Sequence, residues 1–365
     1  MKVEHGRISS SALLFLIIGF IQANIILFDF NSNISGRDTW LCIIAALTMS
    51  IPIVYAYCSL SKRFPGKNLF EIHELVYGSF FGKVISAGYI FMFLSLMAVN
   101  IRVMGDFFLT FSLPETPLWA ILIMFTFVCA WAVRAGLEVI ARCSHILVLT
   151  SSGLYALTIL MLLKDMEFSN LLPVLDLPLK KFIQSSHVSL TIFFLEVMVF
   201  LAFIPYVNKL EQAKKSVLLG LILGGVTLLI IELRNITTLG PIISISASPG
   251  FATVRMINVA KVFTRLDMIV AYILFGNMFL KASVIYYATV LGLAQTLRLK
   301  SYTGIVIPVG IIAISLAISS FDSSMEQIYV GSNIWPFIAM PFEFFILITL
   351  LVAKIRGLPK GGKSR

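Results

Sequence analysis

The chain has 365 residues, of which 59% are hydrophobic and only 13% are charged, and its formal net charge is +10. A soluble domain of this length would need many more polar residues to cover its surface. The composition therefore excludes an ordinary soluble protein and indicates a polytopic membrane protein.

The apolar residues gather in blocks of about 20, the length that an α-helix needs to cross the hydrocarbon core of a bilayer. The first block resembles a signal peptide in its position. No small-residue cleavage site follows it, however, and further spans come after it, so we expect it to be retained as the first helix. The ten predicted spans are 8–28, 38–60, 84–111, 117–134, 144–163, 187–206, 216–239, 264–290, 303–320 and 334–353.

The basic excess follows this predicted topology. If both ends lie in the cytoplasm, most of the 28 Lys and Arg residues fall in the inner connections and the two ends, as the positive-inside rule requires. The distribution supports an even number of spans with both termini cytoplasmic. It argues against a patch that binds nucleic acid, and the partner surface we expect is the lipid bilayer.

Ten spans divide into two sets of five, and because five is odd the second set runs in the opposite orientation. This is the topology of an inverted repeat in an all-α membrane protein, in which the first helix of each half is often interrupted at the binding site. Gly19 and the run Gln22-Ala23-Asn24 interrupt the first span, while Glu196 and Pro205 interrupt the sixth. The expected organisation is a single membrane domain over 1–365, with repeat 1 at about 8–163, repeat 2 at about 187–353 and a basic cytoplasmic tail at 354–365.

Glu196 is the most central charged residue within a span, in the stretch FFLEVMVF. Ionisable groups inside a membrane are costly and usually face a cavity or a partner. Glu196 is therefore a candidate for hydrogen-bonding a polar ligand or carrying a proton. The alternative is a neutral side chain that bonds to backbone groups freed by a helix break.

Lys281 lies in the inner half of the eighth span, with Asn277 one turn earlier on the same helix face. Three roles are open for Lys281. It could act as a fixed cation in place of a sodium ion, it could pair with Glu196, or its long side chain could reach the cytoplasmic surface. Asn277 favours a polar lining on this face.

Arg102 and Asp106 lie four residues apart in the outer third of the third span. This spacing places both side chains on one face of a helix, where they are able to pair. We expect a structural ion pair, with a ligand gate or an interface with another helix as the alternatives.

The four cysteines and four histidines are dispersed along the chain. No spacing typical of a metal site, a redox pair or a catalytic triad is visible among them. We therefore expect neither an enzyme nor a bound cofactor or metal.

Several segments together resemble the B subunits of endospore germinant receptors, also called spore germination permeases, within the amino acid–polyamine–organocation transporter superfamily. The resemblance covers nearly the whole chain. The matching segments are FPGKNLFEIHELVYGSFFGKVISAGY, NIRVMGDFF with Arg102 and Asp106, PETPLW, RAGLEVIARCSHI, NLLPVLDLPLKKFI, FLEVMVFLAFIPYVNK with Glu196 and Pro205, and TRLDMI.

This resemblance implies a subunit of the spore inner membrane that recognises a nutrient together with an A subunit and a lipoprotein C subunit. Members of the family help to trigger ion release when dormancy ends. Family members often carry a Gly-rich break in the first helix, whereas this chain has GFIQANIILF there. An amino acid, a sugar and a nucleoside therefore all remain open as the nutrient.

The hypothesis from the sequence is a transporter-like nutrient sensor with a pocket between the first, third, sixth and eighth helices. The expected ligand-binding residues are Glu196, Gly19, Gln22, Asn24, Asn277 and Lys281. The main alternative is a proton-coupled amino-acid permease of growing cells with Glu196 as the proton carrier. A membrane scaffold without a ligand is a third possibility.

Overall fold

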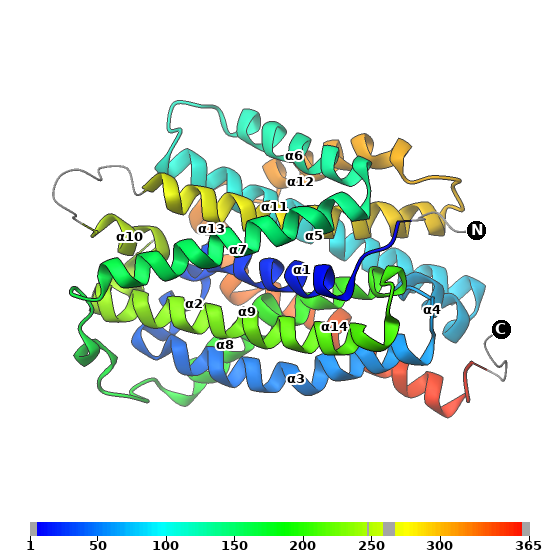
Figure 1. Ribbon diagram of the computed structural model, residues 1–365, viewed down its shortest axis with the longest axis horizontal. Coiled ribbons are helices and arrows are strands. Elements are labelled where there is room, and N and C mark those ends of the chain that lie inside the picture. The colour runs from blue at the N-terminus through cyan, green and yellow to red at the C-terminus, as the bar shows by residue number, and fades with distance from the viewer. Residues whose placement is uncertain (1–5, 247, 258–266, 360–365) are drawn as a thin grey trace.

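The computed structural model describes residues 6–246, 248–257 and 267–359 of the chain. Long helices run side by side along the length of the molecule, and α1 begins at the same end at which α14 finishes (Figure 1). We call this the inner end, following the orientation that the charge distribution predicts, and the opposite end the outer end. The motif TRLDMI begins outside the described residues, and the predicted basic tail is described only as far as 359.

The first half of the chain contains the segments that correspond to the first five predicted spans. Ser9 caps the first helix, because its hydroxyl accepts a hydrogen bond from the backbone N–H of Ala12. The elements are α1 (Ser10–Gln22), η1 (Ala23–Leu27), α2 (Asp29–Ser35), η2 (Gly36–Asp38), α3 (Thr39–Arg63), α4 (Leu69–Tyr77), α5 (Ser79–Phe111), α6 (Leu118–Ala135) and α7 (Leu137–Leu162).

The rest of the described chain begins with a loop that holds one short helix. Its elements are η3 (Phe168–Leu171), α8 (Leu179–Val188), η4 (Ser189–Phe194), η5 (Leu195–Ala202), η6 (Ile204–Tyr206), α9 (Leu210–Leu239), η7 (Gly240–Ile245), α10 (Pro249–Arg255), α11 (Asp267–Thr296), η8 (Thr303–Ile305), α12 (Val306–Ser319), α13 (Ser324–Asn333) and α14 (Trp335–Ile355). The described part contains no strand beyond an isolated bridge between Ile8 and Val207.

Nine helices of the described residues are long and apolar enough to cross a membrane. They correspond to the predicted spans except the ninth. In that region, 303–319 and 324–333 together pass the same test, but the chain bends by 97° between them. α12 is too short to cross a bilayer of about 30 Å at 1.5 Å per residue. The ninth predicted span is therefore not one continuous helix, and the described residues give nine spans, or ten if the bent pair is counted as one.

The two interruptions expected in the first and sixth helices are confirmed. The first helix changes from α-helical to 3-10 geometry at η1 and then continues as α2. The sixth starts as α8, widens into a π-helix at η4, and narrows to 3-10 geometry at η5 and η6. Departures of this kind change which backbone groups pair within the helix, and they often mark functional positions.

The halves pack reciprocally. α1 lies against α9, and η4 and η5 lie against α3, while α5 lies against α11. This exchange of partners is consistent with an inverted repeat. The approach of α1 to α9 is close, because a Cβ atom at Gly220 would lie 2.9 Å from Ile17 and one at Gly224 would lie 2.9 Å from Ile21.

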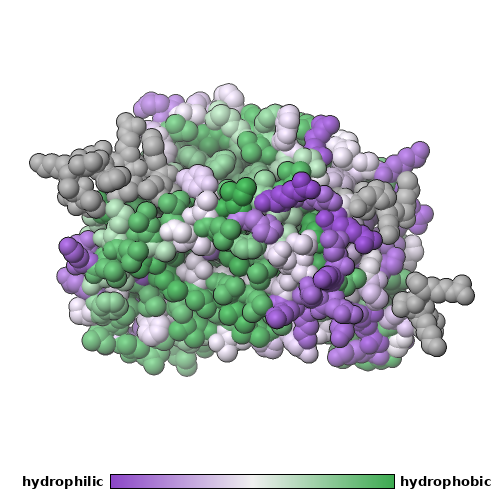
Figure 2. All heavy atoms as spheres, viewed as in Figure 1, coloured by the Kyte–Doolittle hydropathy of each residue, from purple (hydrophilic) through white to green (hydrophobic). Residues whose placement is uncertain are grey.

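Between the segments that correspond to the second and third predicted spans lies the short helix α4, at the inner end (Figure 1). Asn68 and Glu71 form a reciprocal capping box at its start. A Cβ atom at Gly82 of α5 would lie 2.6 Å from the backbone of Glu74, so α4 docks directly on α5. In Figure 2 hydrophobic residues cover the middle of the visible face, and hydrophilic residues gather towards the inner end.

Candidate functional site

An ion pair connects the sixth and eighth spans inside the bundle. The Nζ atom of Lys281 in α11 lies 2.7 Å from Oε2 of Glu196 in η5, and both side chains are buried. The two opposite charges therefore form a buried salt bridge. Of the three roles open for Lys281, the geometry shows the pairing with Glu196.

Asn24 of η1 completes this cluster. Its Oδ1 atom accepts a hydrogen bond of 2.5 Å from Lys281, and its Nδ2 atom donates one of 3.2 Å to the backbone oxygen of Phe193. Asn24 thus ties both interrupted helices to the ammonium group. A buried ion pair needs such additional hydrogen bonds, because the attraction between the charges only partly offsets their desolvation. We call Asn24, Glu196 and Lys281 the central cluster.

Gln22 and Asn277 lie in a neighbouring polar network. The hydroxyl of Ser151 in α7 approaches Oε1 of Gln22 and Oδ1 of Asn277, each at 3.3 Å. Gln22 also donates to Ser152 at 3.1 Å, and Asn277 donates to the Tyr155 hydroxyl at 3.5 Å. The fifth span, which the sequence did not implicate, thereby holds both amides.

Gly19 lies where α1 meets two other helices. A Cβ atom at this position would lie 2.7 Å from Leu280 of α11 and 2.8 Å from Val148 of α7. The structure therefore brings together three of the six expected ligand-binding residues, places two in the adjoining network and packs Gly19 between helices. Their roles in ligand binding stay predictions.

Arg102 and Asp106 form the expected ion pair. The Nε atom of Arg102 lies 3.0 Å from each carboxylate oxygen of Asp106. The Nη1 atom donates to the backbone oxygens of Ala317 at 3.0 Å and Phe321 at 2.8 Å. These carbonyls lie where α12 ends, so Arg102 also satisfies backbone acceptors at the bend between α12 and α13.

A small cavity adjoins the central cluster. Its volume is about 20 Å³, enough for one water molecule. Glu196 lines it together with two polar residues that the sequence analysis missed, Asn100 of α5 and Gln327 of α13. Asn100 donates to the backbone oxygen of Leu96 at 2.7 Å, which leaves its Oδ1 atom without a partner among the described residues. The only signal in the sequence was a polar residue in an apolar span.

Glu343 of α14 adds a second carboxyl group to this region. It is buried, neither of its oxygens has a hydrogen-bond partner in the described part of the chain, and its helix packs against η5, which carries Glu196. The Tyr57 hydroxyl donates to the backbone oxygen of Glu343 at 2.9 Å. The sequence offered no partner for this residue.

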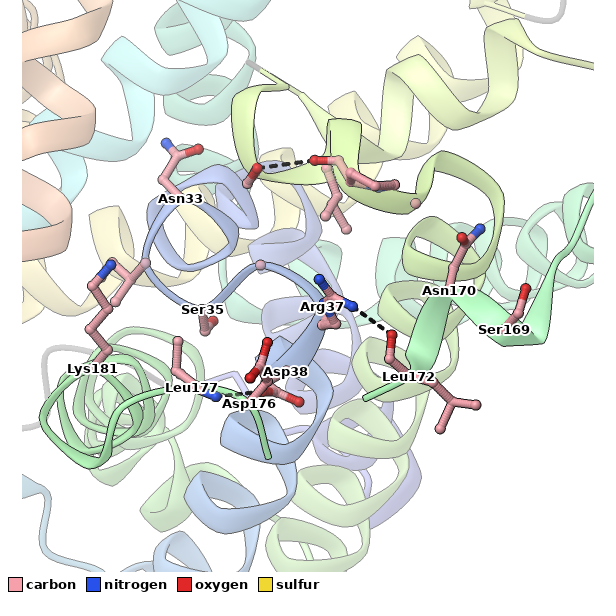
Figure 3. A pocket seen from close by; sticks show the side chains of 16 residues that line it. Asn33, Ser35, Arg37, Asp38, Ser169, Asn170, Leu172, Asp176, Leu177 and Lys181 are labelled. Carbon is pink, nitrogen blue, oxygen red and sulfur yellow. Dashed lines mark hydrogen bonds between the residues drawn. The ribbon is translucent and has the colours of Figure 1, made fainter. Parts of the chain in front are cut away.

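A wider cavity of about 380 Å³ opens between loops at the outer end (Figure 3). Arg37 points to the loop and donates to the backbone oxygen of Leu172 at 2.5 Å. The Asp38 carboxylate accepts from the backbone N–H groups of Leu175 and Leu177, both at 3.1 Å. These charged groups hold the loop to the bundle, and none of the expected ligand-binding residues lines the cavity.

Three solved transporters share this fold. MHP1, a nucleobase-cation-symport-1 family transporter with bromovinylhydantoin bound, has a TM-score of 0.64 at 11% identity over 96% of this chain and 77% of that chain. A Na⁺-coupled sialic acid symporter has a TM-score of 0.63 at 10% identity, covering 96% and 80%. MhsT in complex with L-phenylalanine has a TM-score of 0.56 at 15% identity, covering 96% and 99%. The chain is therefore a transporter-like helical bundle.

Two proteins that are similar to this chain in sequence are both named spore germination proteins. Spore germination protein KB of Bacillus subtilis (strain 168) is 25% identical over 368 residues, covering 100% of this chain and 98% of the relative. Spore germination protein YndE of the same organism is 23% identical over 323 residues, covering 86% of each. The family model described as spore germination protein matches residues 7–325. With most of its length matched, this non-enzymatic membrane protein belongs to the spore germination protein family.

Proposed function

We propose that the chain is the transporter-like subunit of a germinant receptor, which binds a small nutrient at the central cluster and triggers germination together with partner subunits. The family membership and the transporter-like fold support this proposal. The solved transporters hold small organic molecules, including bromovinylhydantoin and L-phenylalanine.

The observation that carries the proposal is the meeting of two interrupted helices at one buried ion pair. Asn24, Glu196 and Lys281 come from η1, η5 and α11, three segments far apart in the sequence. A ligand with polar groups would exchange hydrogen bonds with all three. Binding would therefore change how these segments are held relative to one another.

The small volume beside Glu196 indicates how binding would act as a signal. About 20 Å³ holds a water molecule but not a nutrient. The ligand must therefore bind better to an expanded arrangement of the same helices, and it shifts the population by its difference in affinity for the two states. The expanded state would be transmitted through the inner connections to the partner subunit.

The partners and the location belong to the same proposal. They are the A subunit and the lipoprotein C subunit that the family resemblance implies, in the spore inner membrane with both termini in the cytoplasm. The bias of basic residues towards the inner connections supports this orientation.

Deletion of the chain in its native strain tests the function. Spores would be challenged with amino acids, sugars and nucleosides, and loss of the response to one class is the expected result. Glu196→Gln should abolish that response, whereas Glu115→Gln, in an exposed loop, should leave it intact. Unchanged germination, combined with lost amino-acid uptake in growing cells, would favour the permease instead. If both germination and amino-acid uptake were unchanged, a membrane scaffold without a ligand would be the remaining function.

A further inference from the structure

A second cavity lies on the outer side of the cavity beside Glu196. Its volume is about 240 Å³, and it is bounded by α2, α5, α13 and the residues before α10. Phe30 and Gln327 line both cavities, so these two side chains separate one from the other. We call this cavity of about 240 Å³ the vestibule. A solute that reaches Glu196 from the outer end by this path passes through the vestibule.

The charges that line the vestibule do not balance. Asp106 is paired with Arg102, but Asp29 has no cationic partner among the described residues. Asp29 is only 6% exposed, and the hydrogen bond to its carboxylate comes from the backbone N–H of Phe30 at 3.0 Å. A buried carboxylate without a counter-charge is unfavourable, so a cation that enters the vestibule gains a partner there.

Three aromatic rings form part of the apolar wall of the vestibule, together with Ile26, Val103, Met325 and Ile328. Phe30, Phe107 and Phe111 all line it, and the rings of Phe107 and Phe111 lie 5.3 Å apart between centroids. The face of an aromatic ring attracts an organic cation, and a carboxylate beside such rings is a favourable arrangement for an ammonium group. Ca²⁺ and Mg²⁺, by contrast, require shells of six or more oxygen ligands.

The size of the vestibule sets the size of the ligand. About 240 Å³ is several times the share of liquid volume that one water molecule occupies, about 30 Å³. The space suits a small organic molecule and is below the usual range of about 300–1,000 Å³ for drug-sized ligands. Thr110, Ser248 and Ser324 add hydroxyl groups for its polar atoms.

We propose that the vestibule binds the ammonium group of a small organic amine, with Asp29 as its counter-ion and Phe30, Phe107 and Phe111 around it. The inference rests on the proposed function and narrows it, because it makes the nutrient an amine and gives it a first binding site before the central cluster. Passage inward then requires Phe30 to move. Its ring lies directly on α13, where a Cβ atom at Gly331 would be 2.2 Å from Cε2 of Phe30.

Calorimetric titration of the purified full-length chain in detergent tests this site without knowledge of the natural nutrient. The probes are phenylethylammonium and its neutral analogue 2-phenylethanol. The amine should bind, and the alcohol should bind at least about tenfold more weakly, because it lacks the charge that pairs with Asp29. Equal affinity for the two probes would overturn the proposal.

Variants assign the binding to the vestibule. Asp29→Asn should weaken amine binding about tenfold, whereas Asp165→Asn, at an exposed position of an outer loop, should not change it. If Asp29→Asn does not fold, Phe111→Leu keeps the carboxylate and should weaken binding about threefold through loss of the ring. Unchanged affinity in the folded variants would place the amine elsewhere and refute the site.

Two further results separate this inference from neighbouring ones. Competition by potassium chloride at physiological concentration, beyond that of an equal concentration of choline chloride, would mean an inorganic cation site and would overturn the proposal. The purified chain could fail to bind the amine, while spores that lack the chain lose their response to a neutral sugar. This pair of results would refute the vestibule site and leave the receptor function intact.

Discussion

Nζ of Lys281 lies 2.7 Å from Oε2 of Glu196, and the same ammonium group donates to Oδ1 of Asn24 at 2.5 Å. One cation of α11 therefore holds the interrupted segments of both halves of the bundle. The two charges depend on each other, because each side chain is fully buried or nearly so, with exposed fractions of 0% and 1%. Removing one of them leaves the other without its counter-charge.

We predict that Glu196→Gln and Lys281→Met each lower the free energy of unfolding by about 3–5 kcal/mol, because each leaves one uncompensated buried charge. The double variant should recover most of this loss, since both charges are then absent. Thermal unfolding of the four proteins in detergent measures the coupling. Strictly additive effects of the two substitutions would contradict an energetically important pair.

The double variant also separates stability from function. If the central cluster contacts the nutrient, spores that carry the stable double variant should fail to respond to it, although the protein is present at normal levels. A normal response from such spores would show that the pair is structural only.

Gly331→Ala should disturb the packing of Phe30, which lies between the vestibule and the cavity beside Glu196. The added Cβ atom would lie 2.2 Å from Cε2 of Phe30, whose ring is buried, so we expect overpacking to destabilise the protein by about 1–3 kcal/mol. Phe30→Leu on the same background should restore part of the stability by removing the clash. Gly153→Ala provides the control, because nothing lies within 4 Å of its Cβ position. A neutral Gly331→Ala would show that the ring moves freely.

The sequence predicted the fold and the central residues for one physical reason. Apolar blocks of about 20 residues are selected by the thickness of a bilayer, and a polar residue inside such a block needs a partner or a cavity. Asn24, Glu196 and Lys281 therefore stood out before any contact was known. Their mutual contacts depend on how distant spans pack, which periodicity does not encode, and the pairing of Lys281 with Glu196 was only one of three open roles.

The features that the sequence did not reveal depend on contacts between residues far apart in the chain. Asn100 and Gln327 are ordinary amides whose importance comes from facing the same cavity as Glu196. The stretch 303–320 that was predicted to cross the membrane contains Pro308 and Gly310, but α12 continues through both residues and the bend of 97° comes only after Ser319. The carbonyl groups freed at that bend accept hydrogen bonds from Arg102, more than 200 residues earlier in the chain.

Arg102→Lys should destabilise the bend between α12 and α13 although it keeps the charge. The guanidinium group serves Asp106 and the carbonyls of Ala317 and Phe321 at once, and an ammonium group does not reproduce this fork. We expect a loss of about 1–3 kcal/mol and faster hydrogen exchange around residues 317–323. Arg142→Lys is the control, since Arg142 is exposed and its ion pair with Glu138 at 3.5 Å contributes little. Equal behaviour of the two variants would refute the role of Arg102.

His73 makes the docking of α4 sensitive to acid. This helix lies outside the membrane-spanning segments, and burial lowers the pKa of His73 from 6.5 to about 3. The native ring is held by a contact of 3.3 Å between Nδ1 and the Ser86 hydroxyl and packs against Tyr89. Below pH 6.5 His73 is protonated in the unfolded chain but stays neutral in the native state. The free energy of unfolding therefore falls as the pH drops towards 3, by about 1.4 kcal/mol for each pH unit.

His73→Phe removes this titration and keeps an aromatic ring in the site. The stability of the wild type relative to the variant should therefore decrease as the pH falls from 7.5 to 5, and it should be constant above pH 7.5. Unfolding in detergent at a series of pH values measures this difference directly. A difference that does not change between pH 7.5 and 5 would mean that His73 titrates alike in the native and unfolded states, and α4 would then not be the acid-sensitive contact.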